Sequence, residues 1–245
     1  MTTITSGYVN QHLLRMTRDP SCTCEYCELK ELFVENLDGD ELDIVCTGKV
    51  ERDYAQGASI IKEGTQIREF SYLKSGLVKL FRTDTSGKEQ IISIAKPMDY
   101  VSLLSVFSNK RYNYSVVALE DSVTCSLKME EVTSLINDNG KLALNLLSKM
   151  SRMTDKLILD SLQIRVKHLR GRVAYLLLYF SEDVYSSEEF DLPLTRKEMA
   201  EYVGMTTENV IRTLSEFRKD GILKIYGKTI LIVNMDSLRS ISEFG

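Results

Sequence analysis

One stretch, Thr195–Leu223, constrains the fold of this chain more than any other; it reads TRKEMAEYVGMTTENVIRTLSEFRKDGIL. Its first threonine is followed three residues later by Glu198, the capping-box start of a helix. Gly204 predicts a tight turn that ends this helix, and Thr206 can cap a second one. Gly221 predicts the end of the second helix. Two helices joined by a short glycine turn describe a helix-turn-helix.

The second predicted helix has two distinct faces. Val210, Leu214 and Phe217 recur at helical spacing and predict a buried stripe. We expect the opposite face to lie in a DNA major groove, and it carries Thr207, Glu208, Ile211, Arg212 and Ser215.

A β-hairpin is predicted directly after this helix. Short β-type runs at 223–225 and 230–233 flank Tyr226-Gly227-Lys228. A hairpin in this position is a wing, and Lys228 at its tip is placed to meet a DNA phosphate.

The segment LTRKEMAEYVGMTTENVIRTL closely resembles the DNA-binding segment of the CRP/FNR family of bacterial transcription regulators, and a looser resemblance covers most of the chain. The resemblance implies that Glu208 and Arg212 read base edges. Their chemistry suits cytosine N4 and guanine O6 and N7, respectively. Ile211 replaces the small residue usual in the family, which leaves the operator sequence open. The predicted DNA contacts are Thr195, Arg196, Thr206, Thr207, Glu208, Ile211, Arg212 and Lys228.

The overall charge of the chain gives no support to DNA binding. Its 31 Lys and Arg against 35 Asp and Glu give a formal net charge of −4. Affinity must therefore come from a few placed cations and from two copies acting together. A helical hairpin is also common in ordinary proteins. The alternative is a ligand-binding β-roll module whose hairpin contacts protein rather than DNA.

Three of the five cysteines are clustered near the N-terminus, at Cys22, Cys24 and Cys27. An odd total argues against a disulfide framework. Close thiolates suit an iron–sulfur cluster or zinc, with Cys125 as a fourth ligand. The FNR branch has such an arrangement, and the resemblance implies an iron–sulfur cluster. Where that branch has its next cysteine, however, this chain has Phe33. A structural zinc, or an arm without any cofactor, therefore stays open.

The middle of the chain predicts a compact β-domain. Turn signals recur at short intervals between β-type runs at 59–61, 70–73, 77–81, 91–94 and 115–118, as in an antiparallel roll or jelly roll. This region resembles the double-stranded β-helix that holds cyclic AMP in the CRP branch. There, an acidic residue and an Arg-Ser pair bind the nucleotide, whereas Leu103, Tyr112 and Asn113 stand near those places here. We do not expect cyclic AMP to bind.

Other chemistries have little support in the sequence. A metalloenzyme of the cupin type needs histidines in the β-runs, but the only histidines are His12 and His168. No catalytic triad, Walker loop or dinucleotide fingerprint appears, so we expect no enzyme. Either histidine could ligate a haem, as in gas-sensing relatives, although such a residue is more often structural.

A long helix is predicted from about Lys141 to His168. Its apolar stripe is Leu142, Leu146, Met150, Met153, Leu157 and Ile164. A stripe this narrow is typical of a helix that meets its own copy, although part of it can pack on the β-roll. In the resembled family this helix forms the dimer interface. We expect the hinge to the DNA-binding part near 165–169, followed by a helix through Val173–Phe180 and a solvated connection over 181–191.

The sequence thus predicts an α+β fold: an N-terminal arm (1–36), a double-stranded β-helix sensor domain (37–136), a dimerisation helix (137–166) and a winged helix-turn-helix (167–245). We expect a homodimeric transcription regulator that binds a palindromic operator, because paired recognition helices read half-sites one DNA turn apart. RNA polymerase is a further expected partner. Since neither a membrane span nor a signal peptide is evident, we expect the protein in the cytoplasm.

Overall fold

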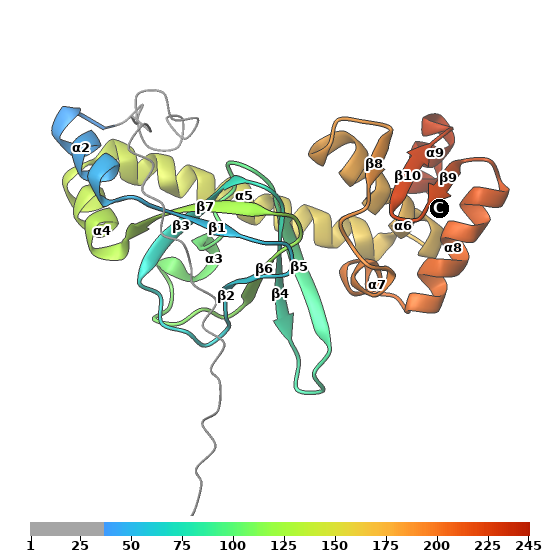
Figure 1. The fold of residues 1–245 in the computed structure, drawn as a ribbon, viewed down its shortest axis with the longest axis horizontal. Coiled ribbons are helices and arrows are strands. Elements are labelled where there is room, and N and C mark those ends of the chain that lie inside the picture. Colours follow the sequence, from blue (N-terminus) through green and yellow to red (C-terminus); the bar gives the residue numbers. More distant parts are fainter. Residues whose placement is uncertain (1–36) are drawn as a thin grey trace, which may run out of the picture.

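One long helix, α5 (Gly140–Val166), runs along a β-roll and then leads into a separate C-terminal group of helices and short strands (Figure 1). The computed structural model describes residues 37–245. The α+β architecture predicted from the sequence is confirmed. No helix of this part of the chain is long and apolar enough to cross a membrane.

The β-roll consists of two antiparallel sheets that face each other. One has the strand order β1 (Val50–Tyr54), β7 (Ser122–Lys128), β3 (Glu69–Ser75). The other has the order β2 (Ser59–Ile61), β6 (Ser115–Ala118), β4 (Val78–Thr83), β5 (Glu89–Ala95). The five β-type runs of the sequence all form strands, whereas β1 and β7 were not predicted.

Side chains of β7 alternate between two environments, as the period of a strand requires. Cys125 and Leu127 join the apolar cluster formed with Phe70 and Leu142. Thr124 and Ser126 are also buried, and Ser126 Oγ lies 2.8 Å from Ser71 Oγ. The residues of β7 alternate between polar and apolar, yet both faces are covered, because the polar side chains Ser122, Thr124 and Ser126 are buried as well.

Short helices flank the sheets: α2 (Gly39–Gly48), α3 (Leu103–Val106) and α4 (Met129–Asp138). Val45 of α2 is buried and belongs to the apolar cluster around Phe70. A capping box between Asp38 and Glu41 fixes where α2 begins.

Helix α5 has two apolar faces, and the predicted stripe lies on the one that covers its own β-roll. Leu142 and Leu146 are fully buried there, and Met150 and Met153 pack against the same cluster. The sequence prediction that part of this stripe packs on the β-roll agrees with these contacts. Its contact with a second copy stays a prediction. A second set of apolar side chains is exposed: Leu144, Leu147, Ile158, Leu159, Leu162 and Val166.

The C-terminal part begins with α6 (Leu169–Leu178), which continues as a π-helix, η3 (Tyr179–Val184). A three-stranded sheet of β8 (Glu189–Asp191), β10 (Thr229–Ile232) and β9 (Leu223–Tyr226) follows the order β8-β10-β9. The remaining helices are α7 (Arg196–Val203), α8 (Thr207–Lys219) and α9 (Met235–Phe244). Residues 181–191 are thus not a plain solvated connection, because they contain most of η3 and the edge strand β8.

The β-roll and the C-terminal part share one hydrophobic core. Leu77, Ile91 and Ile94 of the β-roll belong to the same buried cluster as Val203 of α7 and Phe217 of α8. The two parts are therefore docked on each other in this structure.

Candidate nucleic-acid interface

Helix α7 begins and ends as the sequence predicts. Thr195 Oγ1 accepts a hydrogen bond from the N–H of Glu198 at 3.2 Å, and Glu198 Oε2 accepts one from the N–H of Thr195 at 2.8 Å. Gly204 ends the helix at φ 67°, a left-handed conformation that glycine adopts without steric cost.

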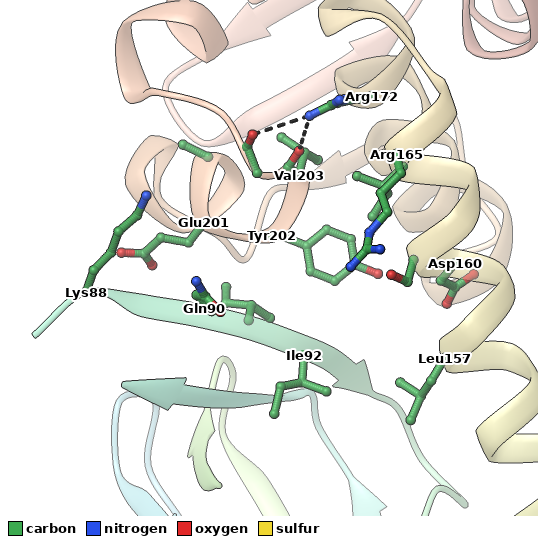
Figure 2. A pocket seen from close by; sticks show the side chains of 15 residues that line it. Lys88, Gln90, Ile92, Leu157, Asp160, Arg165, Arg172, Glu201, Tyr202 and Val203 are labelled. Carbon is green, nitrogen blue, oxygen red and sulfur yellow. Dashed lines mark hydrogen bonds between the residues drawn. The ribbon is translucent and has the colours of Figure 1, made fainter. Parts of the chain in front are cut away.

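An arginine from α6 holds the turn between α7 and α8. Arg172 Nη1 donates to the carbonyl oxygens of Val203 and Gly204, both at 3.3 Å (Figure 2). Its Nε donates to the carbonyl of Lys167 at 2.9 Å. Arg172 thus links the turn to the segment where α5 gives way to α6. The sequence reasoning missed it, because the contact joins residues about thirty positions apart.

Helix α8 buries the stripe that the sequence predicts. Val210, Leu214 and Phe217 are buried, and Thr206 Oγ1 caps the helix by accepting from the N–H of Asn209 at 3.3 Å. This arrangement fixes the rotation of α8 about its own axis. The opposite side must then face away from the protein core.

The outward side of α8 presents an acid, an aliphatic side chain and a base next to one another. Glu208 is exposed, Ile211 is 49% exposed, and the Arg212 side chain is 65% exposed. Thr207 and Ser215 lie on the same side but are half-buried. Side chains three and four positions apart are neighbours on a helix, so Glu208, Ile211 and Arg212 form one surface.

Two of these side chains are held by local hydrogen bonds. Arg212 Nη2 donates to Asn209 Oδ1 at 2.8 Å, and its Nε lies 3.9 Å from Glu216 Oε1. The backbone N–H of Glu208 and the Thr206 hydroxyl lower the pKa of the Glu208 carboxyl. Glu208 is therefore an ionised acceptor at neutral pH, as contact with a cytosine amino group requires.

The remaining predicted contacts lie around one shallow cleft. Thr195, Arg196 and Lys228 line a space of about 320 Å³ together with Gln56 of the β-roll. Burial lowers the pKa of Arg196, which is half-buried, whereas Thr195 and Lys228 are exposed. Three groups able to bind phosphate thus converge from the start of α7 and from the β9–β10 turn.

The cysteine residues are only partly within the described chain. Cys22, Cys24 and Cys27 lie outside it, while Cys125 is fully buried in β7. The described residues contain no group of three or more His, Cys, Asp or Glu side chains able to hold a metal.

The region corresponding to a cyclic-nucleotide site does not fit a cyclic phosphate. Tyr114 is buried, and its hydroxyl donates to the carbonyl of Val101 at 3.0 Å. Arg111 Nη1 donates to the carbonyl of Gly64 at 2.6 Å on the exposed side of the loop. A cleft of about 410 Å³ remains beside Tyr112, but its Arg52 is paired with Glu69 through two bonds of 2.7 Å. A buried phosphate there would have to compete with that carboxylate.

Of the two histidines considered as haem ligands, only His168 lies within the described chain. His12 lies outside it, and His168 is exposed between α5 and α6, where its backbone N–H donates to the carbonyl of Gly245.

A third cleft lies between the two parts of the molecule. Its volume is about 520 Å³, and it is lined by β5, α5 and α7 (Figure 2). Glu201 of α7 lies near Lys88, which precedes β5, whereas Tyr202 points toward Asp160 and Arg165 of α5 (Figure 2). The sensor, the long helix and the helix-turn-helix therefore meet at one place.

These features define a class of protein. A β-roll docked on a winged helix-turn-helix, whose second helix has an open polar face, is a DNA-binding regulator with an attached sensor domain.

Comparison with known proteins supports this class and gives the family. Residues 171–241 match the Crp-like helix-turn-helix domain, and residues 51–139 match the cyclic nucleotide-binding domain. The chain is 26% identical over 246 residues to the fumarate and nitrate reduction regulatory protein of Salmonella typhimurium, covering 95% of this chain and 96% of that protein. The protein of the same name from Escherichia coli is similar to the same extent.

Solved structures share the fold. FixK2 from Bradyrhizobium japonicum gives a TM-score of 0.71 at 22% identity, over 79% of this chain and 96% of that one. A putative transcriptional regulator of the crp/fnr family from Eubacterium rectale gives 0.74 at 18% identity, over 87% and 99%. The chain belongs to the CRP/FNR family of transcription regulators.

Proposed function

We propose that this regulator binds a palindromic operator as a homodimer and reads each half-site with Glu208, Ile211 and Arg212. The observation that carries the proposal is the single exposed surface these three form on α8, opposite a fully buried stripe. Thr206 and Thr207 at the start of α8, and Thr195, Arg196 and Lys228 around the neighbouring cleft, contact the phosphate backbone.

The test of DNA reading is selection of a binding site from random duplexes by the purified protein. We expect an enriched palindrome with half-sites about 10 base pairs apart. Its affinity should fall steeply with salt. Enrichment of no sequence, together with salt-independent retention on DNA, would instead favour the alternative in which the helical hairpin contacts a protein.

The second apolar face of α5 supports the homodimer. Ile158, Leu162 and Val166 follow at four-residue steps on the side opposite Leu142 and Leu146, so they form an exposed stripe on one side of the helix. Two such stripes packed against each other would place two copies of α8 on one duplex.

A charge in this stripe tests the dimer. We expect Leu162→Glu to produce monomers in sedimentation analysis and to lower operator affinity by a factor of about 10²–10⁴, because the second half-site loses its linked partner. Gln163→Glu adds the same charge at the next exposed position and is the matched control. A Leu162→Glu protein that stays dimeric would place the interface elsewhere.

For the signal, we propose a thiolate-bound iron–sulfur cluster or zinc held by Cys22, Cys24, Cys27 and Cys125. Leu37, which directly follows the arm, packs against the apolar cluster that contains Cys125. The ten residues from Cys27 to Leu37 can span up to about 35 Å. When bound, such a group would supply a redox- or metal-dependent link between the arm and β7.

Anaerobic purification under reducing conditions tests this site, because only thiolates bind the metal. We expect bound zinc, or iron with sulfide and a visible absorption band that bleaches in air. Cys125→Ser should lose the metal, whereas Ser126→Ala, on the opposite face of β7, should keep it. Equal metal content in wild type and Cys125→Ser would remove Cys125 from the ligand set.

The cellular setting follows from the same proposal. A regulator that binds operators acts where the chromosome lies, which in bacteria is the cytoplasm. We also infer that the DNA-bound dimer contacts RNA polymerase at neighbouring promoters, and an RNA polymerase retention assay on operator DNA tests that contact.

A further inference from the structure

The β-roll contains a buried cation at the place where it meets α7. The Lys79 side chain, on β4, is only 8% exposed. Its Nζ lies 2.9 Å from Glu89 Oε2 and 2.8 Å from Glu198 Oε1, and 4.8 Å from the centre of the Phe81 ring. Among the residues whose burial the structure describes, Lys79 is the only charged one that is buried as a whole.

Lys79 and Glu198 are both ionised at neutral pH. Burial acts to lower the pKa of Lys79, but the hydrogen bonds to Glu198 and Glu89 outweigh it, and the pKa is raised. Burial acts to raise the pKa of Glu198, but the bonds from Lys79 and Thr195 outweigh it, and the pKa is lowered. An ion removed from water in this way depends on its partners.

The Glu198 carboxylate connects two parts of the molecule. Its Oε2 accepts from the N–H of Thr195 and so caps α7, while its Oε1 accepts from Lys79 of the sensor sheet. The first turn of the helix-turn-helix is thereby attached directly to β4. A displacement of β4 would be transmitted to the start of α7 through one side chain.

A separate attachment joins the β-roll to η3. The Tyr179 hydroxyl donates to the carbonyl of Ile94 at 3.1 Å, and Lys96 Nζ donates to the carbonyl of Asp183 at 2.8 Å. These bonds act together with the apolar core that the two parts share. The Lys79–Glu198 pair adds a charged attachment on a different helix, at the start of α7.

We propose that Lys79 is a positioning residue for DNA binding. It acts through Glu198 to hold α7 and α8 against the sheet that contains β4, so that the exposed surface of α8 faces outwards. This inference rests on the proposed function only in its second test. In the docked arrangement Glu208, Ile211, Arg212 and Lys228 are all exposed, so the pair holds a conformation that is open to DNA.

The first test needs no DNA. The full-length protein is treated with an amine-acetylating reagent, and modification of Lys79 is compared by mass spectrometry with that of exposed Lys62. We expect Lys79 to react at least about tenfold more slowly than Lys62 in the wild type, since it is desolvated and paired. In Glu198→Gln the rate at Lys79 should rise while the rate at Lys62 stays constant. Equal rates at Lys79 and Lys62 in the wild type would overturn the proposal.

The second test measures operator affinity for Lys79→Met, Glu198→Gln and the double variant. Glutamine also serves at the third position of a capping box, so Glu198→Gln keeps the cap of α7 and removes only the charge. We expect each single variant to bind about tenfold more weakly, within the usual range of coupling between sites. The double variant should be no weaker than the weaker single, because both remove the same link.

Lys62→Met is the matched control, since it makes the same substitution at an exposed site of the β-roll. If Lys79→Met does not fold, Glu198→Gln alone decides. Wild-type affinity in a folded Glu198→Gln protein, or additive losses in the double variant, would overturn the proposal. If neither the wild type nor Lys62→Met bound operator DNA, the proposed function would be wrong. The acetylation result would still test the buried Lys79–Glu198 pair.

Discussion

The outward side of α8 and the interior of the β-roll differ in residue type and in what covers them. On α8 the side chains of Glu208, Ile211 and Arg212 are exposed, and their positions are fixed only by neighbours on the same helix. In the β-roll, Tyr114 and Tyr112 are buried and packed edge to face, with ring centres 5.9 Å apart. The first surface is open to a partner, while the second is occupied by the protein itself.

The contrast separates the part of the molecule whose side chains are free to meet DNA from the part whose side chains fill the protein interior. The reading surface keeps an acid and a base four positions apart, so its chemistry matches that of the family it resembles. The β-roll keeps the fold of a cyclic nucleotide-binding domain. Aromatic rings fill part of its interior, and the cleft that remains is lined by the paired Arg52 and Glu69. We propose the arm with its cysteines as the place where the signal enters.

Removing an aromatic ring from the β-roll should have the largest effect of the changes that test this contrast. We expect Tyr114→Ala to lower the free energy of unfolding by about 3–5 kcal/mol, as for other large aromatic side chains truncated in cores. Ile211→Ala, on the open surface, should change it by no more than about 0.5 kcal/mol. Denaturant titration of both variants measures this, and a similar small effect for Tyr114→Ala would mean that the interior is not packed as described.

On the reading surface, Arg212→Ala should weaken operator binding by about 1–3 kcal/mol and relax the preference at one base pair. The reason is the loss of a bidentate contact to guanine. Fluorescence anisotropy with a set of single-base operator variants measures both quantities. Arg82→Ala, an exposed arginine of the β-roll, is the control. An unchanged base preference after Arg212→Ala would show that α8 is not docked by this surface.

Ile211 offers a smaller and more specific test. An exposed aliphatic side chain in a major groove is expected to contact a thymine methyl group. Replacing thymine by deoxyuridine, position by position, removes only that methyl and should cost about 1 kcal/mol at a single site. The cost should vanish in Ile211→Ala. If replacing a thymine lowered the affinity of the wild type and of Ile211→Ala equally, Ile211 would not contact that methyl group.

The smallest effect is expected for Lys228→Ala. Loss of one phosphate contact should weaken all sequences alike and reduce the magnitude of the salt slope by about 1. Affinity measured over a series of salt concentrations gives this slope for operator and random DNA. A loss confined to the operator would assign Lys228 to base reading.

The sequence predicted best those features whose causes are local. The capping residues Thr195 and Thr206, the turn at Gly204 and the hairpin around Gly227 each depend on a few neighbouring residues, and all are present. The placement of Glu208 and Arg212 on the outer face followed from helical spacing alone. Their roles in DNA reading stay predictions.

Features that depend on distant partners were missed. Strand β8 has only three residues and exists through its pairing with β10. Lys79 reads in the sequence as a polar interruption of an apolar run, and only the docking of Glu198 makes it a buried ion. Helix α5 is a third case. The sequence analysis named one apolar stripe, and only the burial of Leu142 and Leu146 against the β-roll separates it from the exposed apolar side chains on the other side.

Those opposite stripes limit how α5 can move. In the proposed dimer, one side of α5 contacts its own β-roll and the opposite side contacts α5 of the partner. Rotation of α5 about its own axis would therefore expose both apolar faces at once. Bending, or sliding along its length, keeps both covered. A change in the β-roll should therefore reach the other subunit as a shift of the far end of α5, next to the turn that Arg172 holds.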